Sequence, residues 1–458
     1  MPLFLSPDNL LFIIILLLFA GACFRNLKYG IYIIIFLMPT YLWRTEIFSI
    51  PATMPELMIY ILFLVWAASK ILTSPYPLLR KEGIYPISNI QYPILILSIV
   101  LLFLGLAIST ALSDNLRISL GIVKGWFIDP FLFFLVLVSV IKTKKQIINL
   151  FGAWALSGLA VAVISLFYLA AGDLTYDGRL SAFFLSPNHL AMYLAPAFLI
   201  LLFFLLKNNK VSSIKYQVLS IIFLITIIIP LYFTFSYGAF LGVAGAALCF
   251  FLLCFNRGSG GFSYQRKMAT RLFSGIILCL FIILLLFSFS SDKFQQIADS
   301  QNRSSFHSRL MIWNSAKEIL KDNFVFGIGP GTFQEVYLSY ADRFDEPYLE
   351  WAVPQPHNIF LAFWLQTGII GLAGFILILI WFFGSALKNR NTIHNPEHSG
   401  QFTIPIILMI YFLIHGLVDT TYWKNDLSLM FWILLGAMVV CSTDDLKTRP
   451  KDSKKLEI

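Results

Sequence analysis

The chain is dominated by long apolar blocks, and this pattern restricts its fold more than any other feature. A helix needs about 20 apolar residues to cross the ~30 Å hydrocarbon layer of a bilayer. Thirteen blocks come near that length: residues 8–24, 28–43, 55–72, 92–112, 118–141, 147–171, 188–206, 216–234, 238–256, 271–290, 357–386, 402–417 and 427–442. Only 12% of the 458 residues are charged, about half the usual share for a soluble protein. The sequence therefore predicts an all-α polytopic membrane protein with about 12–13 transmembrane helices.

The basic residues are divided unevenly between alternate loops. Of the 33 Lys and Arg residues, 22 fall on one side, ten fall on the other, and Lys124 lies inside a span. The positive-inside rule places the richer side in the cytoplasm, so we expect the N-terminus outside and the tail, residues 443–458, inside. The net charge of +9 then reflects topology, and it does not predict a nucleic-acid partner.

With this topology the chain forms one membrane domain with a single large outward loop. Residues 1–290 would hold ten transmembrane helices, residues 357–442 the last three, and residues 291–356 the loop between them. No internal repeat of 20–50 residues and no inverted repeat is evident. Nothing else in the sequence is long enough to form a separate soluble domain.

The outward loop carries two amphipathic stretches. After Ser308, a candidate N-cap, a helical pattern places apolar side chains on one face: Leu310, Trp313, Ala316 and Leu320. The segment GIGPG at 327–331 breaks this pattern, and a second amphipathic stretch begins at Phe333. We expect both helices to lie on the outer membrane surface or to cap the bundle.

The sequence offers no metal or cofactor motif. All five cysteines fall in or at the end of apolar blocks, so no CxxC site or disulfide framework is available. The GIGPG glycines lack a preceding strand and GxGxxG spacing, so they indicate a turn rather than a nucleotide-binding loop. We therefore expect neither a metal nor a cofactor.

Unusual polar residues mark four places at the outward membrane boundary. Arg179 precedes Asn188 and a helix, Tyr237 lies in a tight turn, Arg309 opens the loop helix, and His357 enters a long span. A guanidinium suits a phosphate because its planar donors bind two oxygens and stay charged. A histidine can accept a hydroxyl proton near neutral pH. If they converge, these residues would suit a diphosphate leaving group and a hydroxyl nucleophile.

Structural roles remain open for the same positions. An arginine at the boundary can extend to lipid headgroups, which is an alternative for Arg179. His357 could simply cap the helix that follows it. For His189 we expect a side chain at the membrane interface. His415 and Asp419 are spaced i,i+4 near the outer boundary, so they predict either functional support or a structural hydrogen bond.

One further polar pair lies within an apolar block. Lys124 and Asp129 lie on either side of a short buried aromatic segment. We expect them to pair with each other locally, and we assign them no catalytic role.

Taken in order, several stretches resemble the O-antigen ligase/polymerase superfamily of bacterial membrane glycosyltransferases. They read GRLSAFFLSPNHLAMYL, SRLMIWNSAKEILKDNFVFGIGPGTF, PHNIFLAFWLQTGIIGL and HGLVDTTYW, and they span about residues 176–424. The resemblance implies a GT-C-like helical bundle in the bacterial cytoplasmic membrane. It also implies a glycan donor on undecaprenyl diphosphate and catalysis at the outer leaflet without a metal ion.

The resemblance leaves the acceptor open. A lipid A-core sugar would make the protein a ligase, another lipid-linked glycan would make it a polymerase, and a protein hydroxyl would make it a protein O-glycosyltransferase. The remaining expected partners are membrane lipids.

Individual residues carry over by motif. Arg309 resembles the loop arginine, His357 and Asn358 form the HN motif, and Arg179 matches the basic residue of the earlier outward loop. Two positions depart from the pattern. Ser-Arg-Gly is replaced by Ser-Tyr237-Gly, and Gln366 stands where the family often has Glu.

These matches predict the roles of the site residues. Arg309 and Arg179 would bind the departing diphosphate with help from Asn358 and Tyr237. His357 would act as general base or only orient the donor, and the displacement would invert the anomeric carbon.

Two other functions compete with that of a glycosyltransferase. A transporter or flippase of lipid-linked sugars would share the hydropathy and charge bias, but it would more often show internal repeats and charges at the membrane midplane. A structural membrane scaffold would leave the loop motifs unexplained.

Overall fold

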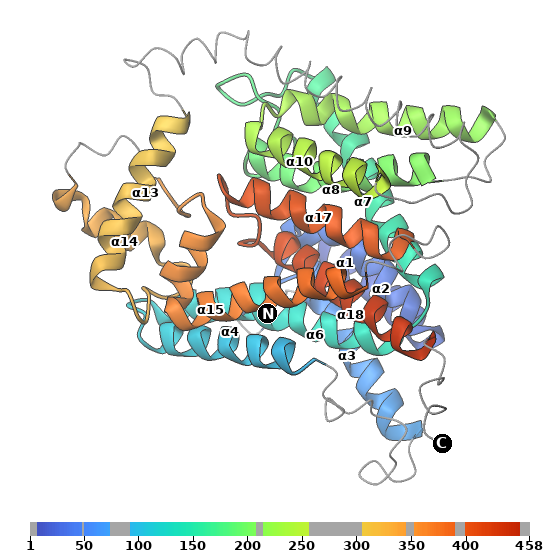
Figure 1. Cartoon of the computed structure of the whole chain (residues 1–458), viewed down its shortest axis with the longest axis horizontal. Helices are drawn as coiled ribbons and strands as arrows, with labels where there is room; N and C mark the ends of the chain where they lie inside the picture. The colour runs from blue at the N-terminus through green and yellow to red at the C-terminus, as the bar shows by residue number, and fades with distance from the viewer. Residues whose placement is uncertain are drawn as a thin grey trace, which may run out of the picture.

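The computed structural model describes residues 7–47, 50–73, 92–207, 214–255, 305–344, 352–389 and 399–448, and its regular structure is almost entirely helical (Figure 1). The α-helices are α1 (Pro7–Arg25), α2 (Leu27–Phe36), α3 (Met54–Thr73), α4 (Pro93–Ala111), α5 (Leu116–Ile122), α6 (Asp129–Val140), α7 (Lys144–Ala170), α8 (Pro187–Lys207), α9 (Ile214–Phe233), α10 (Tyr237–Phe255), α13 (Ser305–Asp322), α14 (Phe333–Ser339), α15 (Ile359–Lys388), α17 (Ser399–Gly416) and α18 (Asn425–Thr448). A short antiparallel hairpin joins β1 (Arg44–Ile47) to β2 (Ile50–Thr53).

The hydropathy prediction of an all-α membrane protein is confirmed. Seven described segments are long and apolar enough to cross a bilayer, and five more are shorter apolar helices. They correspond to twelve of the thirteen predicted blocks, while residues 271–290 lie outside the described residues. One block is less regular than predicted, because a π-helical turn at Val123–Ile128 separates α5 from α6. Such turns occur often at functional sites.

Small residues allow the helices of the bundle to approach closely. α4 lies along α15, and a Cβ placed on Gly105 would come within 2.2 Å of the backbone nitrogen of Gly371. α10 packs on α17 in the same way, because a Cβ on Gly242 would lie 2.8 Å from the Tyr411 ring. The GAFLG sequence at 238–242 therefore packs within the chain, through the close contacts that small residues permit between helices.

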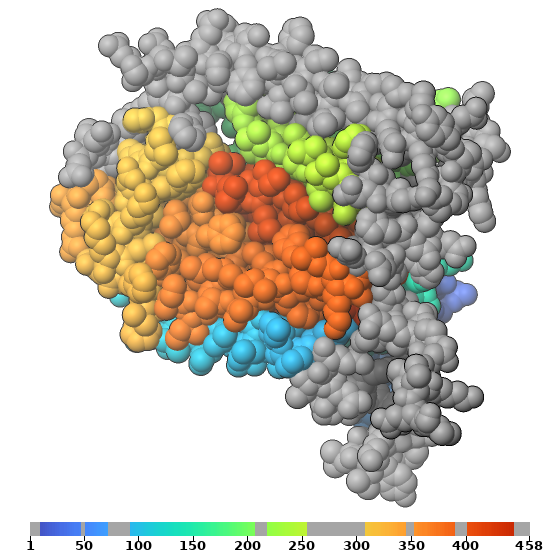
Figure 2. All heavy atoms as spheres, viewed as in Figure 1, coloured from blue at the N-terminus to red at the C-terminus, as the bar shows by residue number. Residues whose placement is uncertain are grey.

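Helices α13 and α14, from the loop predicted to face outward, cap one end of the bundle. Figure 1 places α13 and α14 beside the start of α15, and Figure 2 shows their side chains packed against it. The predicted N-cap was wrong, because α13 begins at Ser305 rather than after Ser308. The predicted apolar face of α13 was partly wrong. Ala316 and Leu320 are buried, but Leu310 is 40% exposed and Trp313 is half-buried.

The GIGPG turn does more than end a helix, since it joins the outward loop to the membrane bundle. The backbone nitrogen of Ile328 donates to the carbonyl of Leu365 at 2.6 Å, and that of Ile369 donates to the carbonyl of Val325 at 3.0 Å. These bonds require a kink in α15, where Gly368 has φ +67° and ψ 179°. A residue with a side chain is strained in that conformation.

Gln366 adds side-chain hydrogen bonds to the contact between the GIGPG turn and α15. Its side-chain carbonyl accepts from the nitrogen of Gly331 at 2.8 Å, and its amide nitrogen donates to Gln355 at 2.8 Å. Because a glutamine supplies both an acceptor and a donor, this fully buried side chain satisfies partners on both sides.

Candidate functional site

Three segments far apart in sequence meet at the end of the bundle that α13 covers. The loop before α8 contributes Arg179, α13 contributes Arg309, and the turn before α15 contributes His357. His357 and Arg309 reach Asp419 or its neighbour Val418 in the turn between α17 and α18 directly, and Arg179 is connected to Asp419 through Asn188. The sequence predicted these residues individually, and the structure brings them into one connected cluster.

Asp419 is the centre of this cluster. One carboxylate oxygen faces Nδ1 of His357 at 3.1 Å and accepts from the backbone nitrogen of Thr420 at 2.9 Å. The other accepts from the amide of Asn188 at 2.9 Å and lies 3.9 Å from Nη2 of Arg309. Burial alone would raise the pKa of Asp419. The charge and hydrogen bond of His357, with the charge of Arg309, hold that pKa well below its usual range. Asp419 is therefore a buried carboxylate that stays ionised.

Arg179 is held by a tight turn and by its own guanidinium. The Thr175 hydroxyl accepts from the Arg179 backbone nitrogen at 3.1 Å, and Nε of Arg179 donates to the carbonyl of Thr234 at 2.7 Å. Nη2 donates to Asn188 at 2.5 Å, and Nη1 lies 4.0 Å from Asp177. Arg179 is thus linked to Asp419 through Asn188, rather than extended toward lipid headgroups.

Arg309 lies in the second turn of α13 and points to the same carboxylate. Its Nε donates to the carbonyl of Val418 at 2.7 Å, which fixes the planar guanidinium next to Asp419. The side chain is 19% exposed, so it is neither fully buried nor freely solvated. A guanidinium in such a position is suited to bind an anion at this end of the bundle.

His357 has an unusual backbone conformation and a defined hydrogen-bond partner. Its φ is +48°, a left-handed value that is uncommon for a residue with a side chain. Its carbonyl accepts from Nε1 of Trp313 at 3.3 Å. An ionised Asp419 can only accept, which favours the tautomer of His357 with the hydrogen on Nδ1. In the neutral ring this leaves the lone pair on Nε2, and the side chain is 31% exposed.

Asn358 and Tyr237 lie beside the cluster. The Asn358 side chain caps α15 by accepting from the nitrogens of Phe360 and Leu361, and its amide donates to the carbonyl of Leu417 at 2.9 Å. Tyr237 is the first residue of α10, half-buried, and it interacts electrostatically with Arg179. Their predicted roles in donor binding stay predictions.

The predicted pairing of His415 with Asp419 is replaced by two separate contacts. α17 ends at Gly416, so the helical i,i+4 geometry does not continue to Asp419. Nδ1 of His415 instead lies 2.9 Å from the Tyr411 hydroxyl, and the ring packs against Gly238. His415 therefore supports the turn before α10, and Asp419 supports His357.

A second polar cluster lies next to the first and was missed. His189, predicted to be interfacial, is fully buried and lies 3.0 Å from the buried carboxylate of Asp426, with the Tyr41 hydroxyl 3.3 Å from its ring. His189 follows Asn188 on the first turn of α8, so consecutive residues bind Asp419 and Asp426. The sequence feature that could have indicated this cluster is the acidic residue Asp426 in the first turn of the apolar helix α18.

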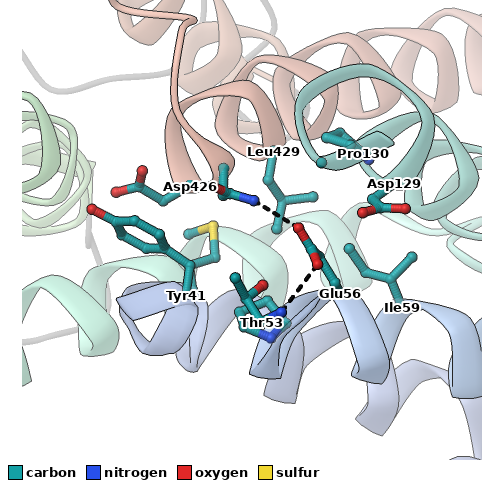
Figure 3. A pocket seen from close by; sticks show the side chains of 12 residues that line it. Tyr41, Thr53, Glu56, Ile59, Asp129, Pro130, Asp426 and Leu429 are labelled. Carbon is teal, nitrogen blue, oxygen red and sulfur yellow. Dashed lines mark hydrogen bonds between the residues drawn. The ribbon is translucent and has the colours of Figure 1, made fainter. Parts of the chain in front are cut away.

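Glu56 extends this second cluster to α3. Its carboxylate accepts from the amide of Asn425 at 2.9 Å and from the backbone nitrogen of Thr53 at 3.0 Å, and Figure 3 shows Glu56 beside Thr53. Lys124 pairs with Glu56 at 2.7 Å, so the prediction that it pairs with Asp129 was wrong. The enclosed cavity, lined by Asp129 and Asp426 among others, has a volume of about 10 Å³. That is room for about one water molecule. The geometry indicates a structural connection between helices.

Metal ligation has no support among the described residues, where no group of three or more His, Cys, Asp or Glu side chains is arranged to hold an ion. Cys23 and Cys441 are buried, as expected for packing residues. The first cluster offers two arginines and a histidine whose side chain is partly exposed. Chemically, it suits anion binding combined with proton abstraction.

Comparison with known families supports this interpretation. Residues 221–376 match the family described as O-antigen ligase, which confirms the resemblance found in the motifs. The matched segment contains Arg309 and His357, whereas Arg179 and Asp419 lie outside it. A comparison with curated proteins gave no match.

Proposed function

Because residues 221–376 belong to the O-antigen ligase family, we propose that this membrane protein transfers a glycan from an undecaprenyl-diphosphate-linked donor to an acceptor hydroxyl. The reaction would take place at the outer leaflet of the bacterial cytoplasmic membrane, with the N-terminus outside. The observation that carries the proposal is the chain of contacts from Arg179 through Asn188 and Asp419 to His357. It joins an anion-binding residue to a residue able to take a proton.

In the proposed step, Nε2 of His357 takes the proton of the acceptor hydroxyl. The hydroxyl oxygen attacks the anomeric carbon, and the bond from that carbon to the phosphate oxygen breaks. The electron pair leaves with the diphosphate, so the configuration inverts. Positioned general bases commonly contribute about 10²–10⁴-fold to the rate.

Asp419 supports His357 in this role through its ionised carboxylate. It fixes the ring with Nδ1 protonated, and its charge stabilises the imidazolium that forms during proton transfer. Asp419 is therefore a positioning residue rather than a group that touches the substrate.

Arg309 and Arg179 support the leaving group. Charge develops on the bridging phosphate oxygen as the bond breaks, and guanidinium groups fixed beforehand can stabilise that charge without reorganising. Arg309 is held at Val418, and Arg179 is held at Thr234 and Asn188, so both are positioned before the donor binds.

The test is glycan transfer by purified protein in proteoliposomes. His357→Ala should lower kcat by about 10²–10⁴-fold. His307→Ala, which changes an exposed histidine at the start of α13, should leave it unchanged. Near-normal turnover by His357→Ala would remove the histidine from the mechanism. Arg309→Lys keeps the charge but loses the bidentate fork, so unchanged activity there would argue against bidentate phosphate binding.

A further inference from the structure

Both arginines of the proposed site are already engaged with the protein. Arg179 uses Nε and Nη2 for Thr234 and Asn188, and Arg309 uses Nε for Val418. A diphosphate carries at least two negative charges, so its binding favours a further cation with unused donors. Lys424, at the end of the turn that carries Asp419, is such a cation.

Lys424 occupies a fixed place beside the cluster. Its backbone nitrogen donates to the carbonyl of Tyr422 at 2.8 Å, and its carbonyl accepts from the nitrogen of Ser428 at 2.9 Å, which anchors it to the first turn of α18. It stands five residues after Asp419 and two before Asp426, the two carboxylates of the adjoining clusters. The residue is partly buried.

The ammonium of Lys424 has no close partner within the described part of the chain. Two other described lysines differ: Lys124 lies 2.7 Å from Glu56, and Lys321 lies 2.6 Å from Glu318. Asp419 is bound to His357 and Asn188, and Asp426 is bound to His189. The three donors of the Lys424 ammonium therefore remain available to a ligand.

The electrostatic surroundings agree with this geometry. Burial lowers the pKa of Lys424, the charges of Asp426 and Asp419 raise it, and the charge of Arg44 lowers it. A partly desolvated ammonium without a close counter-charge is unfavourable, and an anionic ligand would relieve that cost.

We propose that Lys424 is a third cation of the donor site and binds the diphosphate group of the lipid-linked donor. This inference rests on the proposed function, since it assigns a ligand to the same site. As a point charge with three rotatable donors, Lys424 would contact a phosphate oxygen that the fixed arginines leave exposed.

The test measures the Kd of undecaprenyl diphosphate for the purified full chain in detergent. Lys424→Met should raise Kd about tenfold to a hundredfold, the usual range for a lost hydrogen bond between charged groups. Lys424→Arg should bind within about threefold of wild type. Lys321→Met, which removes an exposed lysine of α13, should bind as wild type does.

Wild-type affinity in folded Lys424→Met, or in Lys424→Gln where the methionine variant does not fold, would overturn the proposal. An excess of phosphatidylglycerol should not displace the diphosphate, and equal displacement would show a general lipid-headgroup site instead. If wild type binds undecaprenyl diphosphate through Lys424 but transfers no glycan, the proposed function fails and the Lys424 site stands.

Discussion

Replacing Asp419 by asparagine tests how the cluster supports catalysis. The two carboxylate oxygens accept from His357 on one side and Asn188 on the other. An asparagine offers only one oxygen, so one of these donors must face an NH₂ group. Asn188 cannot turn its amide to compensate without losing the bond from Arg179.

The size of the effect follows from these contacts. One hydrogen bond to a charged group is worth about 1.5–3 kcal/mol, equivalent to roughly 10–10²-fold in rate. The lost negative charge also destabilises the imidazolium, so we expect Asp419→Asn to lower kcat by about 10²–10⁴-fold in total. The donor KM should change less, because Asp419 does not contact the donor.

The assay is glycan transfer in proteoliposomes, with thermal stability measured on the same preparations. Asp419→Asn has nearly the same volume as the native residue, so the folded protein should remain available for kinetic analysis. A kcat within about threefold of wild type would refute the view that His357 depends on this carboxylate.

Three further predictions concern the same region. Gly368→Ala should destabilise the protein by about 1–3 kcal/mol or more, because φ is +67° and the new Cβ would lie 2.4 Å from the Val325 carbonyl oxygen; thermal unfolding should show this, whereas Gly384→Ala, with open space around it on the same helix, should be neutral. Asn188→Ala should lower kcat about 10–10²-fold in the transfer assay by disconnecting Arg179 from Asp419. Because the folded pKa of Asp419 is depressed, its carboxylate stabilises the fold above the unfolded pKa of about 4 and stops doing so as pH falls further. The stability advantage of wild type over Asp419→Asn should therefore shrink as pH falls below about 4 in denaturation experiments.

Local features of the sequence predicted most of the helices. A transmembrane span needs only enough consecutive apolar residues, and an amphipathic loop helix needs only its periodicity, so both can be recognised in one stretch of chain. The π-helical turn at Val123–Ile128 and the kink at Gly368 were not predictable in this way. The kink depends on hydrogen bonds to residue 325, which no local pattern records.

In the candidate site too, local features were predictable from the sequence and contacts between distant segments were not. The residue types of Arg309 and His357 indicated phosphate and proton chemistry. The central position of Asp419 could not be read from the sequence, because its partner Asn188 is 231 residues away. The i,i+4 spacing favoured His415 as the partner of Asp419, but the helix ends at Gly416. His189 looked interfacial because its partner Asp426 belongs to another helix.

The most direct test of the proposed function places an undecaprenyl-diphosphate-linked glycan and an acceptor in the same leaflet of a proteoliposome that holds the purified protein. We expect glycan transfer to the acceptor with release of undecaprenyl diphosphate, without movement of the donor across the bilayer, and loss of transfer in His357→Ala. Movement of the donor to the other leaflet without transfer would contradict the account and identify the protein as a transporter.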